Sequence, residues 1–187
     1  MNLLALVAAL SLADAAPPST VEGMAPVPGR PNLLVSGVPE IPAPLAERLA
    51  QYLEPRSAAL LDVTADGGAV LIATRFGNTS QLHLVEQPLG ARTQLTFSRE
   101  PIRVARFLPG DPQVIFYLQD RGGAEAYQVF RLDRRTGRSE MLTDGKSRHT
   151  DLVLSRDGRR IAWSGTGRNG RDTDVYVAEL EKPREAR

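Results

Sequence analysis

An internal repeat constrains the fold more than any other feature, because one arrangement of strands and turns occurs three times beyond Arg56. Each copy begins with an apolar strand, a tight turn and a second apolar strand. The copies are Ala59–Thr74 (ALLDVTADGGAVLIAT), Arg103–Gln119 (RVARFLPGDPQVIFYLQ) and Thr150–Gly165 (TDLVLSRDGRRIAWSG). Asp66, Gly110 and Asp157 mark the turns at intervals of 44 and 47 residues. Asp and Gly tolerate the positive φ angles that a short hairpin loop demands, so each copy should be a β-hairpin.

Each copy continues through a polar, glycine-bearing loop into a third strand, and the first two copies also have a short fourth strand. The third strands are Gln81–Glu86, Gln128–Asp133 and Asp174–Glu179, and the fourth strands are Arg92–Thr96 and Arg138–Thr143. Four strands in about 45 residues are typical of a propeller blade. We therefore predict an all-β fold, a partial β-propeller of about three four-stranded blades with the third incomplete. The blades should span about residues 55–96, 97–144 and 145–187.

An immunoglobulin-like sandwich is the alternative architecture, since it also uses short strands with frequent turns. The repeat argues against it, because sandwich strands need not be self-similar, whereas each blade must cover an equivalent face of its neighbour. Propellers close with roughly 4–8 blades. We therefore expect this sequence to be a piece of a longer chain. The less favoured alternative is a protomer that completes its ring with another molecule. The outer edge of Asp174–Glu179 should be unpaired, and the isolated chain should self-associate.

The N-terminal third has a different character from the repeat. Leu3–Ala13 is an apolar run too short to span a bilayer, and Ala13-Asp14-Ala15 offers a small-x-small cleavage site. Residues 1–15 are thus predicted to be a signal peptide, cleaved after Ala15, which makes the protein exported, periplasmic or secreted. Residues 16–54 should form a leader whose proline density excludes regular structure up to Pro44, followed by one short helix. In that helix Leu45, Leu49 and Leu53 recur every four residues.

Composition excludes several classes of function. Lys and Arg number 23 against 22 Asp and Glu, and this balance gives no support to a nucleic-acid or polybasic membrane binder. The chain has no cysteine, which removes disulfides, thiolate catalysis and iron–sulfur clusters. Only His83 and His149 remain for imidazole chemistry. We expect no nucleic-acid partner, no cofactor, no metal and no stable membrane span after signal cleavage.

The segments have an order that resembles a known family. The TADG, LPGD and SRDG turns are similar to those of the TolB-like propeller repeat. The succession RSAALLDVTADGGAVLIATRFGNTSQLH, REPI, LTDGKSRHTD and SRDGRRIAWSGTGRNGRDTDVYV resembles the N-terminal propeller of exported bacterial serine peptidases of the prolyl oligopeptidase family, over about Asn32–Leu180. The resemblance implies a propeller that caps a C-terminal α/β-hydrolase domain with a Ser-Asp-His triad and admits short or unstructured peptides.

No catalytic residue of that family can be carried over to this sequence. The chain contains no G-x-S-x-G, the turn that holds the nucleophilic serine of such a hydrolase. We therefore expect the chain alone to be inactive and assign no catalytic, cofactor-binding or metal-binding residue. The alternative function is a non-enzymatic periplasmic TolB-like propeller that acts as a protein-interaction module.

Four local patterns resemble sites, and none of them is assigned as one. Gly165–Gly170 matches G-x-G-x-x-G, but a strand rather than a helix should follow, which favours a hairpin loop over a phosphate cradle. His149, Asp151 and Ser155 or Ser164 lie on or beside a single strand without mutual orientation. His83 alternates with leucines and should take a polar sheet or interblade position. Asp172 and Asp174 alone supply too few oxygen ligands for a cation site.

The loops between the second and third strands are the remaining candidates for contact with peptide or with the hydrolase domain. They contain Arg75–Asn78, Asp120–Gly123 and Arg168–Asp172. Solvated turns are the default interpretation of such charged, glycine-bearing loops.

Overall fold

The structure is a computed structural model that describes residues 24–27, 29–53 and 55–187. The predicted signal peptide and its cleavage site lie outside the described residues. The chain divides into two compact units, Met1–Glu54 and Pro55–Arg187, and each is treated by itself. No helix within the described ranges is both long enough and apolar enough to cross a membrane.

The first unit contains a hairpin in the proline-rich leader. Strands β1 (Ala25–Val27) and β2 (Arg30–Val35) pair antiparallel, and Gly29 in the turn between them has φ +74°. The prediction that proline density excludes regular structure here is therefore wrong. In a two-stranded sheet every strand has one open edge, and a residue whose N–H would point to that edge can be proline without loss of a ladder hydrogen bond.

The predicted helix is present as α1 (Ala43–Leu53). Pro44 lies in its first turn, where a missing N–H removes no intrahelical bond. The leucines that recur every four residues are exposed, with exposed fractions of 48% for Leu45, 40% for Leu49 and 68% for Leu53. The helix thus presents an exposed apolar stripe.

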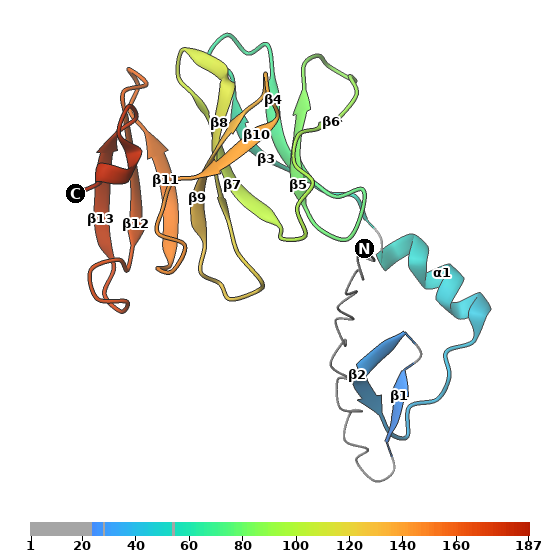
Figure 1. Ribbon diagram of the computed structural model, residues 1–187. Coiled ribbons are helices and arrows are strands. Elements are labelled where there is room, and N and C mark those ends of the chain that lie inside the picture. The colour runs from blue at the N-terminus through green and yellow to red at the C-terminus, as the bar shows by residue number, and fades with distance from the viewer. Residues whose placement is uncertain (1–23, 28, 54) are drawn as a thin grey trace, which may run out of the picture. The chain divides into compact units, whose positions relative to one another are not determined.

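The second unit consists of three antiparallel sheets that follow one another along the chain (Figure 1). The first sheet has the order β3 (Ala58–Val63), β4 (Val70–Thr74), β5 (Gln81–Val85) and β6 (Thr93–Gln94). The second has β7 (Ile102–Leu108), β8 (Asp111–Gln119), β9 (Gln128–Asp133) and β10 (Arg138–Met141). The third has β11 (His149–Leu154), β12 (Arg160–Gly165) and β13 (Asp174–Glu179). The all-β, blade-like architecture predicted from the repeat is confirmed.

The tight turns inside each sheet have the geometry that their residue types predict. Gly67, Gly110 and Gly158 have φ angles of +69°, +86° and +67°. In the first turn Asp66 accepts the N–H of Gly68 at 3.0 Å and the hydroxyl of Thr64 at 2.6 Å. These short-range bonds fix the turn without any help from neighbouring sheets.

Two apolar cores lie between successive sheets. One joins the first and second sheets and includes Leu71, Leu82, Ile115 and Tyr117. The other joins the second and third sheets, where Val114, Phe116 and Val129 meet residues of β11, β12 and β13 such as Ile161 and Trp163. The middle sheet is therefore buried on both faces, which explains the near-continuous buried run along β8.

Polar contacts tie the first strands of neighbouring sheets to one another. The Asp62 carboxylate of β3 accepts the N–H of Phe107 of β7 at 2.8 Å. In return the Arg106 guanidinium donates to the carbonyl oxygen of Leu61 at 2.8 Å. Sheets that stack side by side through their first strands are what a row of propeller blades requires.

A buried glutamine at the start of each third strand in the first two sheets ties that strand to the following connection. The amide nitrogen of Gln128, which has no exposed surface, donates to the carbonyl oxygens of Ala126 and Ser147 at 3.0 and 2.7 Å. Its amide oxygen accepts from the Thr143 hydroxyl at 2.7 Å and the Gly145 N–H at 2.9 Å. Gln81 makes the equivalent bonds to Ser98 and Glu100 in the first sheet. The repeat therefore extends to buried polar contacts.

The outer edge of the third sheet differs in one respect from the prediction. After the 3-10 turn Pro183–Glu185 the chain returns to β13, and Val177 and Arg187 exchange two backbone hydrogen bonds, at 2.9 and 3.0 Å. The expectation that the whole edge of Asp174–Glu179 is unpaired is therefore wrong at Val177. The turn is short enough to bring a later residue back to the same strand.

Candidate functional site

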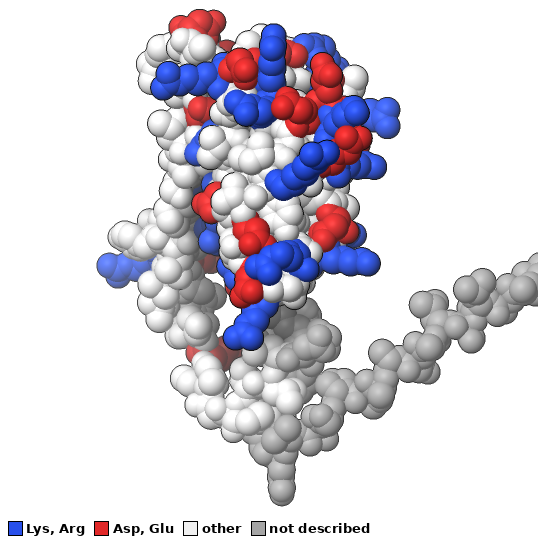
Figure 2. Space-filling view, turned by 90° about the vertical axis from the view of Figure 1, so that its left-hand side faces the viewer, with Lys and Arg blue, Asp and Glu red and all other residues white. Residues whose placement is uncertain are grey.

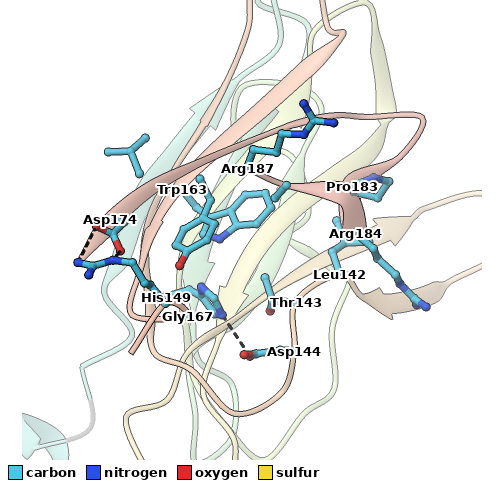
Figure 3. A pocket seen from close by; sticks show the side chains of 14 residues that line it. Leu142, Thr143, Asp144, His149, Trp163, Gly167, Asp174, Pro183, Arg184 and Arg187 are labelled. Atoms are coloured by element: carbon cyan, nitrogen blue, oxygen red, sulfur yellow. Dashed lines mark hydrogen bonds and ion pairs between the residues drawn. The ribbon is translucent and has the colours of Figure 1, made fainter. Parts of the chain in front are cut away.

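A hollow of about 700 Å³ opens in the second unit between the outer parts of the second and third sheets. Figure 3 shows its side chains converging from the end of β10, from β11 to β13 and from the C-terminal turn. Its lining residues are Leu142, Thr143, Asp144, His149, Trp163, Gly167, Arg168, Asp174, Val175, Tyr176, Pro183, Arg184, Ala186 and Arg187. We call this hollow the 142–187 pocket.

Two stacked aromatic rings form one wall of the 142–187 pocket. Trp163 of β12 and Tyr176 of β13 are register partners, with ring centroids 6.2 Å apart and planes inclined by 12°. The same positions of the second sheet hold Tyr117 and Phe130, which stack at 5.2 Å. Directly opposed residues on adjacent strands point to the same face, so the stacking follows from the register.

His149 of β11 stands edge-on to both rings, with centroids 6.3 Å from Trp163 and 6.5 Å from Tyr176. Glycines 165 and 167 give these rings room. A Cβ at Gly165 would lie 2.5 Å from His149 Nδ1, and one at Gly167 would lie 2.9 Å from the Tyr176 hydroxyl oxygen. These close approaches explain two glycines of the G-x-G-x-x-G pattern without any phosphate.

Asp144 faces His149 across the pocket, with 3.5 Å between Oδ1 and Nε2 (Figure 3). Burial opposes ionisation of Asp144, but the Ser147 hydroxyl and the N–H groups of Lys146 and Ser147 donate to its carboxylate and hold its pKa well below the ordinary value. Burial lowers the pKa of His149, against the attraction of Asp144. The pair is therefore a carboxylate beside a neutral imidazole at neutral pH rather than a strong salt bridge.

Two nitrogen atoms in the 142–187 pocket have no hydrogen-bond partner within the part of the chain that the structure describes. They are His149 Nδ1 and Trp163 Nε1, and both are buried. An indole N–H is a donor only, whereas a neutral imidazole nitrogen can accept. Buried polar atoms without partners are uncommon, so these two atoms mark where an occupant could form hydrogen bonds.

The rim of the pocket is organised by a local ion pair. Arg168 Nε donates to Asp174 Oδ2 at 2.7 Å, and its guanidinium lies 3.6 Å from Asp172. The bond from Arg168 lowers the pKa of Asp174. Since these groups are exposed, the pair shapes the loop more than it stabilises the fold.

The other candidate residues are not brought together into a catalytic arrangement. The Ser155 hydroxyl donates to Asp157 in its own turn, and Ser164 pairs with Thr150 across β11 and β12. Asp151 is an exposed residue at a β-bulge, with φ +56°. Among the described residues the His149 ring therefore has Asp144 as a hydrogen-bond partner and no hydrogen bond to a hydroxyl that it could activate.

His83 of β5 is fully buried, as a polar sheet position. Its Nδ1 lies 3.0 Å from the Gln81 carbonyl oxygen, and its ring packs against Phe76 at 5.2 Å. Within residues 24–27, 29–53 and 55–187, no cluster of three or more His, Asp or Glu side chains could hold a metal ion.

The loops between second and third strands lie at one end of the sheets (Figure 1). In the loop that follows β8, Gly122 N–H donates to Glu100 Oε1 at 3.1 Å, and Asp120 is buried. In the loop that follows β4, Phe76 is 49% exposed and lies beneath the Arg56 guanidinium. The loop after β12 is a hairpin loop that leads directly into strand β13, with no intervening helix.

Sequence reasoning placed the aromatic residues on strands but did not identify the 142–187 pocket. One signal was present, because Tyr117 and Phe130 recur as Trp163 and Tyr176 after 46 residues in both cases. Asp144 had no such signal, because it lies in the irregular connection between β10 and β11, five residues before His149, where no strand repeat applies.

Figure 2 views the chain from the side of β13 and shows basic and acidic side chains interspersed rather than separated by sign. On that face the charge does not gather into a single-sign field of the kind that attracts a polyanion.

Comparison with solved structures agrees with the fold. The chain is similar to a putative TolB from Agrobacterium tumefaciens, with a TM-score of 0.56, 15% identity and coverage of 67% of this chain and 47% of that one. It is also similar to the β-propeller domain of the Trilobed protease from Pyrococcus furiosus, with a TM-score of 0.51, 10% identity and coverage of 68% and 40%. Dipeptidyl peptidase 4 from Porphyromonas gingivalis gives a TM-score of 0.58, 15% identity and coverage of 70% and 19%.

The chain thus spans less than half the length of each of these three structures. No protein-family model and no curated protein matches the sequence. At these identities the similarity shows the fold, which is that of β-propeller domains in TolB and in peptidases.

Proposed function

We propose that the chain is the N-terminal propeller portion of an exported serine peptidase of the prolyl oligopeptidase family. Its role would be to gate peptide access to an α/β-hydrolase domain that is not encoded in these residues. The observation that carries the proposal is the succession of three blade-like sheets, each with an Asp-Gly or Gly-Asp turn between its first two strands, in the order that resembles this family. The similarity to dipeptidyl peptidase 4 supports it.

Gating would come from the shape of the blades rather than from chemistry within them. The loops that begin at Arg75, Asp120 and Arg168 gather at one end of the sheets, where a peptide or a neighbouring domain could meet them. The partners proposed are therefore peptide substrates and the hydrolase domain. A rigid rim that excludes folded proteins restricts hydrolysis to short or unstructured chains.

The chain alone should hydrolyse no peptide bond. The sequence has no nucleophile elbow, and His149 faces a carboxylate and two aromatic rings rather than a serine hydroxyl. We also propose export to the periplasm or the medium, on the strength of the apolar run Leu3–Ala13. N-terminal sequencing of the exported protein should find Ala16 first, and an intact Met1 would contradict the proposal.

A second candidate function is a non-enzymatic periplasmic TolB-like propeller that serves as a protein-interaction module. The similarity to the Agrobacterium TolB, which covers 67% of this chain, favours it. The two proposals differ in whether the native polypeptide carries a hydrolase.

The test uses native protein captured from its source with an antibody raised against residues 55–187. The captured protein is incubated with a short chromogenic peptide and with a folded protein that contains the same cleavage sequence. Gating predicts cleavage of the peptide and survival of the folded protein. Equal cleavage of both substrates would refute gating, and cleavage of neither would favour the interaction module.

A further inference from the structure

The connection between the second and third sheets has an equivalent between the first and second sheets. The stretch from β6 to β7 and the stretch from β10 to β11 are of equal length. The amide nitrogen of Gln81 donates to the carbonyl oxygen of Glu100 at 3.0 Å. In the same way the amide nitrogen of Gln128 donates to the carbonyl oxygen of Ser147 at 2.7 Å. Ser147 therefore occupies the position that Glu100 has in the earlier connection.

The earlier connection contributes a carboxylate to the loop that lies beside it. Glu100 Oε1 accepts the N–H of Gly122, in the loop between β8 and β9, at 3.1 Å. The preceding residue is Arg99, so the side chains of residues 95–101 carry one positive and one negative charge. A carboxylate of the chain itself thus bridges the connection and the loop, and the charges of the connection cancel.

The later connection has a hydroxyl where the earlier one has this carboxylate. The Ser147 hydroxyl donates to Asp144 at 2.6 Å, and Asp144 lines the 142–187 pocket beside His149. Lys146 and Arg148 flank Ser147 and are exposed. Neither of these two cations forms an ion pair with any residue that the structure describes. The later connection therefore carries unneutralised positive charge at the place where the earlier one has its own anion.

Lys146 and Arg148 line a hollow of about 400 Å³ between the loop after β8 and the loop after β12. Its lining residues are Ala124, Glu125, Ala126, Lys146, Ser147, Arg148, Thr166 and Gly170. We call it the 124–170 hollow. The two sheets that carry these loops pack on each other through a buried apolar core, so the fold holds the walls of the hollow in place.

Hydrogen bonds fix the backbone on one side of the 124–170 hollow. The N–H of Thr166 donates to the carbonyl oxygen of Arg148 at 3.0 Å, and the N–H of Arg148 donates to the Thr166 hydroxyl oxygen at 3.2 Å. The N–H of Gly170 donates to the carbonyl oxygen of Thr166 at 2.7 Å. A wall that is ordered before binding loses less conformational entropy when a ligand arrives. The Thr166 hydroxyl also keeps its own proton for donation to a ligand.

Glu125 is the one acidic side chain among the lining residues of the 124–170 hollow. It is exposed, and its φ of +55° is uncommon for a residue other than glycine. In the described part of the chain it forms no ion pair with Lys146 or Arg148. The lining side chains together carry two positive charges and one negative charge, so the hollow attracts an anion and Glu125 weakens that attraction.

We propose that the 124–170 hollow binds a carboxylate of a peptide, in the place that the Glu100 carboxylate holds at the earlier connection. Lys146 and Arg148 supply the positive charge and charge-assisted hydrogen bonds, and the Thr166 hydroxyl donates a further bond. The biological role of this site rests on the proposed peptide gating, because the site makes acidic peptides the class that the rim of loops prefers. Binding itself needs no hydrolase domain and can be measured on this chain.

The test is an NMR titration of the full ¹⁵N-labelled chain with three pentapeptides. Acetyl-GGDGG-amide has one side-chain carboxylate, acetyl-GGGGG with a free C-terminus has one main-chain carboxylate, and acetyl-GGNGG-amide has none. Saturable shifts of the backbone amide signals of Arg148 and Thr166 are expected with a carboxylate peptide, with a Kd at least about tenfold below that of the uncharged peptide. The tighter of the two carboxylate peptides identifies whether a side chain or a chain end is bound.

Single substitutions locate the bound carboxylate. Lys146→Gln and Arg148→Gln each remove one cation and should weaken binding by about fivefold. Glu125→Gln removes the opposing charge and should tighten binding by about twofold. The matched control is Arg99→Gln, at the position of the earlier connection that is equivalent to Lys146, and it should leave the Kd within about twofold. All four side chains are on the surface or in hollows, and the dispersion of the same spectra shows whether each variant is folded.

Two results would overturn the proposal. The first is equal affinity for the carboxylate peptides and the uncharged peptide. The second is equal weakening by Lys146→Gln and Arg99→Gln, which would show attraction by net charge rather than binding in the hollow. Failure of this site is distinct from failure of the proposed function. Captured native protein that cleaves the chromogenic peptide would keep the peptidase proposal even if the carboxylate preference were absent, and carboxylate binding by this chain would stand even if the captured protein cleaved nothing.

Discussion

Gly158 offers a direct test of how the second and third sheets pack against each other. It lies in the turn between β11 and β12 with φ +67°, and a Cβ at this position would lie 2.6 Å from the carbonyl oxygen of Pro109 in the turn between β7 and β8. Gly67 is the matched control. It lies in the equivalent turn of the first sheet with φ +69°, and a Cβ at Gly67 would meet no atom within 4 Å.

The two substitutions share one cost and differ in the other. In either turn, alanine in the left-handed backbone region destabilises the folded state by about 1–2 kcal/mol. Alanine also restricts the unfolded chain, and this smaller stabilising effect offsets part of that cost. Gly158→Ala must in addition displace a backbone oxygen, and overpacking of this kind costs about 1–3 kcal/mol. We therefore expect Gly158→Ala to destabilise the protein by about 1–3 kcal/mol more than Gly67→Ala.

Urea unfolding followed by Trp163 fluorescence and by far-ultraviolet circular dichroism measures both free energies of unfolding. If the two probes give coincident transitions, unfolding is two-state and the free energies of unfolding of the two variants can be compared. A difference between the variants below about 0.5 kcal/mol would refute the close approach of the two turns, and with it the packing of the second sheet on the third.

Further predictions concern buried polar groups and pH. Gln128→Leu leaves the four hydrogen-bond partners of this amide without their bonds and should lower the free energy of unfolding in urea by about 2–4 kcal/mol. The control Gln87→Leu, at an exposed position, should change it little. Equal effects of the two substitutions would contradict the buried role of Gln128. His149 has a pKa lowered by burial, below the value of 6.5 that it regains on unfolding. The unfolded state therefore binds the proton more readily, so stability should fall as pH drops through and below 6.5. His149→Gln should flatten that fall between about pH 7.5 and 5.5, a range above the titration of Asp144, and an unchanged slope would refute it.

The strands are well predicted from the sequence because their signals are local. Alternating apolar residues and turns of Asp and Gly act over a few positions. The bounds of β9 and β13 agree with the predicted third strands to within a residue, and β7 begins one residue before the predicted hairpin that starts at Arg103. The same turns fix their own geometry, as the bonds of Asp66 show. The repeat then predicts the arrangement of the sheets, because copies of one unit stack on equivalent faces.

The errors and omissions arise where distant or context-dependent contacts decide the structure. Proline density predicts irregular structure, yet the edges of the β1–β2 hairpin tolerate proline. The return of Arg187 to Val177 depends on a short turn that has no periodic pattern. The contact between Asp144 and His149 spans only five residues, but it lies in the irregular connection between β10 and β11, where Asp144 also accepts the N–H groups of Lys146 and Ser147. Strand periodicity gives no information about such a segment.

Gln81 and Gln128 carry a signal in the sequence that strand periodicity alone does not reveal. They recur after 47 residues at the start of the third strand, as do Thr96 and Thr143, which accept the N–H groups of Leu82 and Val129. A polar residue that recurs in register with a strand repeat indicates a buried hydrogen-bond role, because a solvated residue has no reason to keep its position.

The central functional proposal is tested most directly by labelling with a fluorophosphonate, which reacts with activated serine nucleophiles. Native protein is captured with the antibody against residues 55–187, labelled, separated by size and identified by peptide mass spectrometry. We expect one labelled polypeptide that contains the blades of this chain and is longer than 187 residues. A captured polypeptide that contains these blades and takes up no label would contradict it.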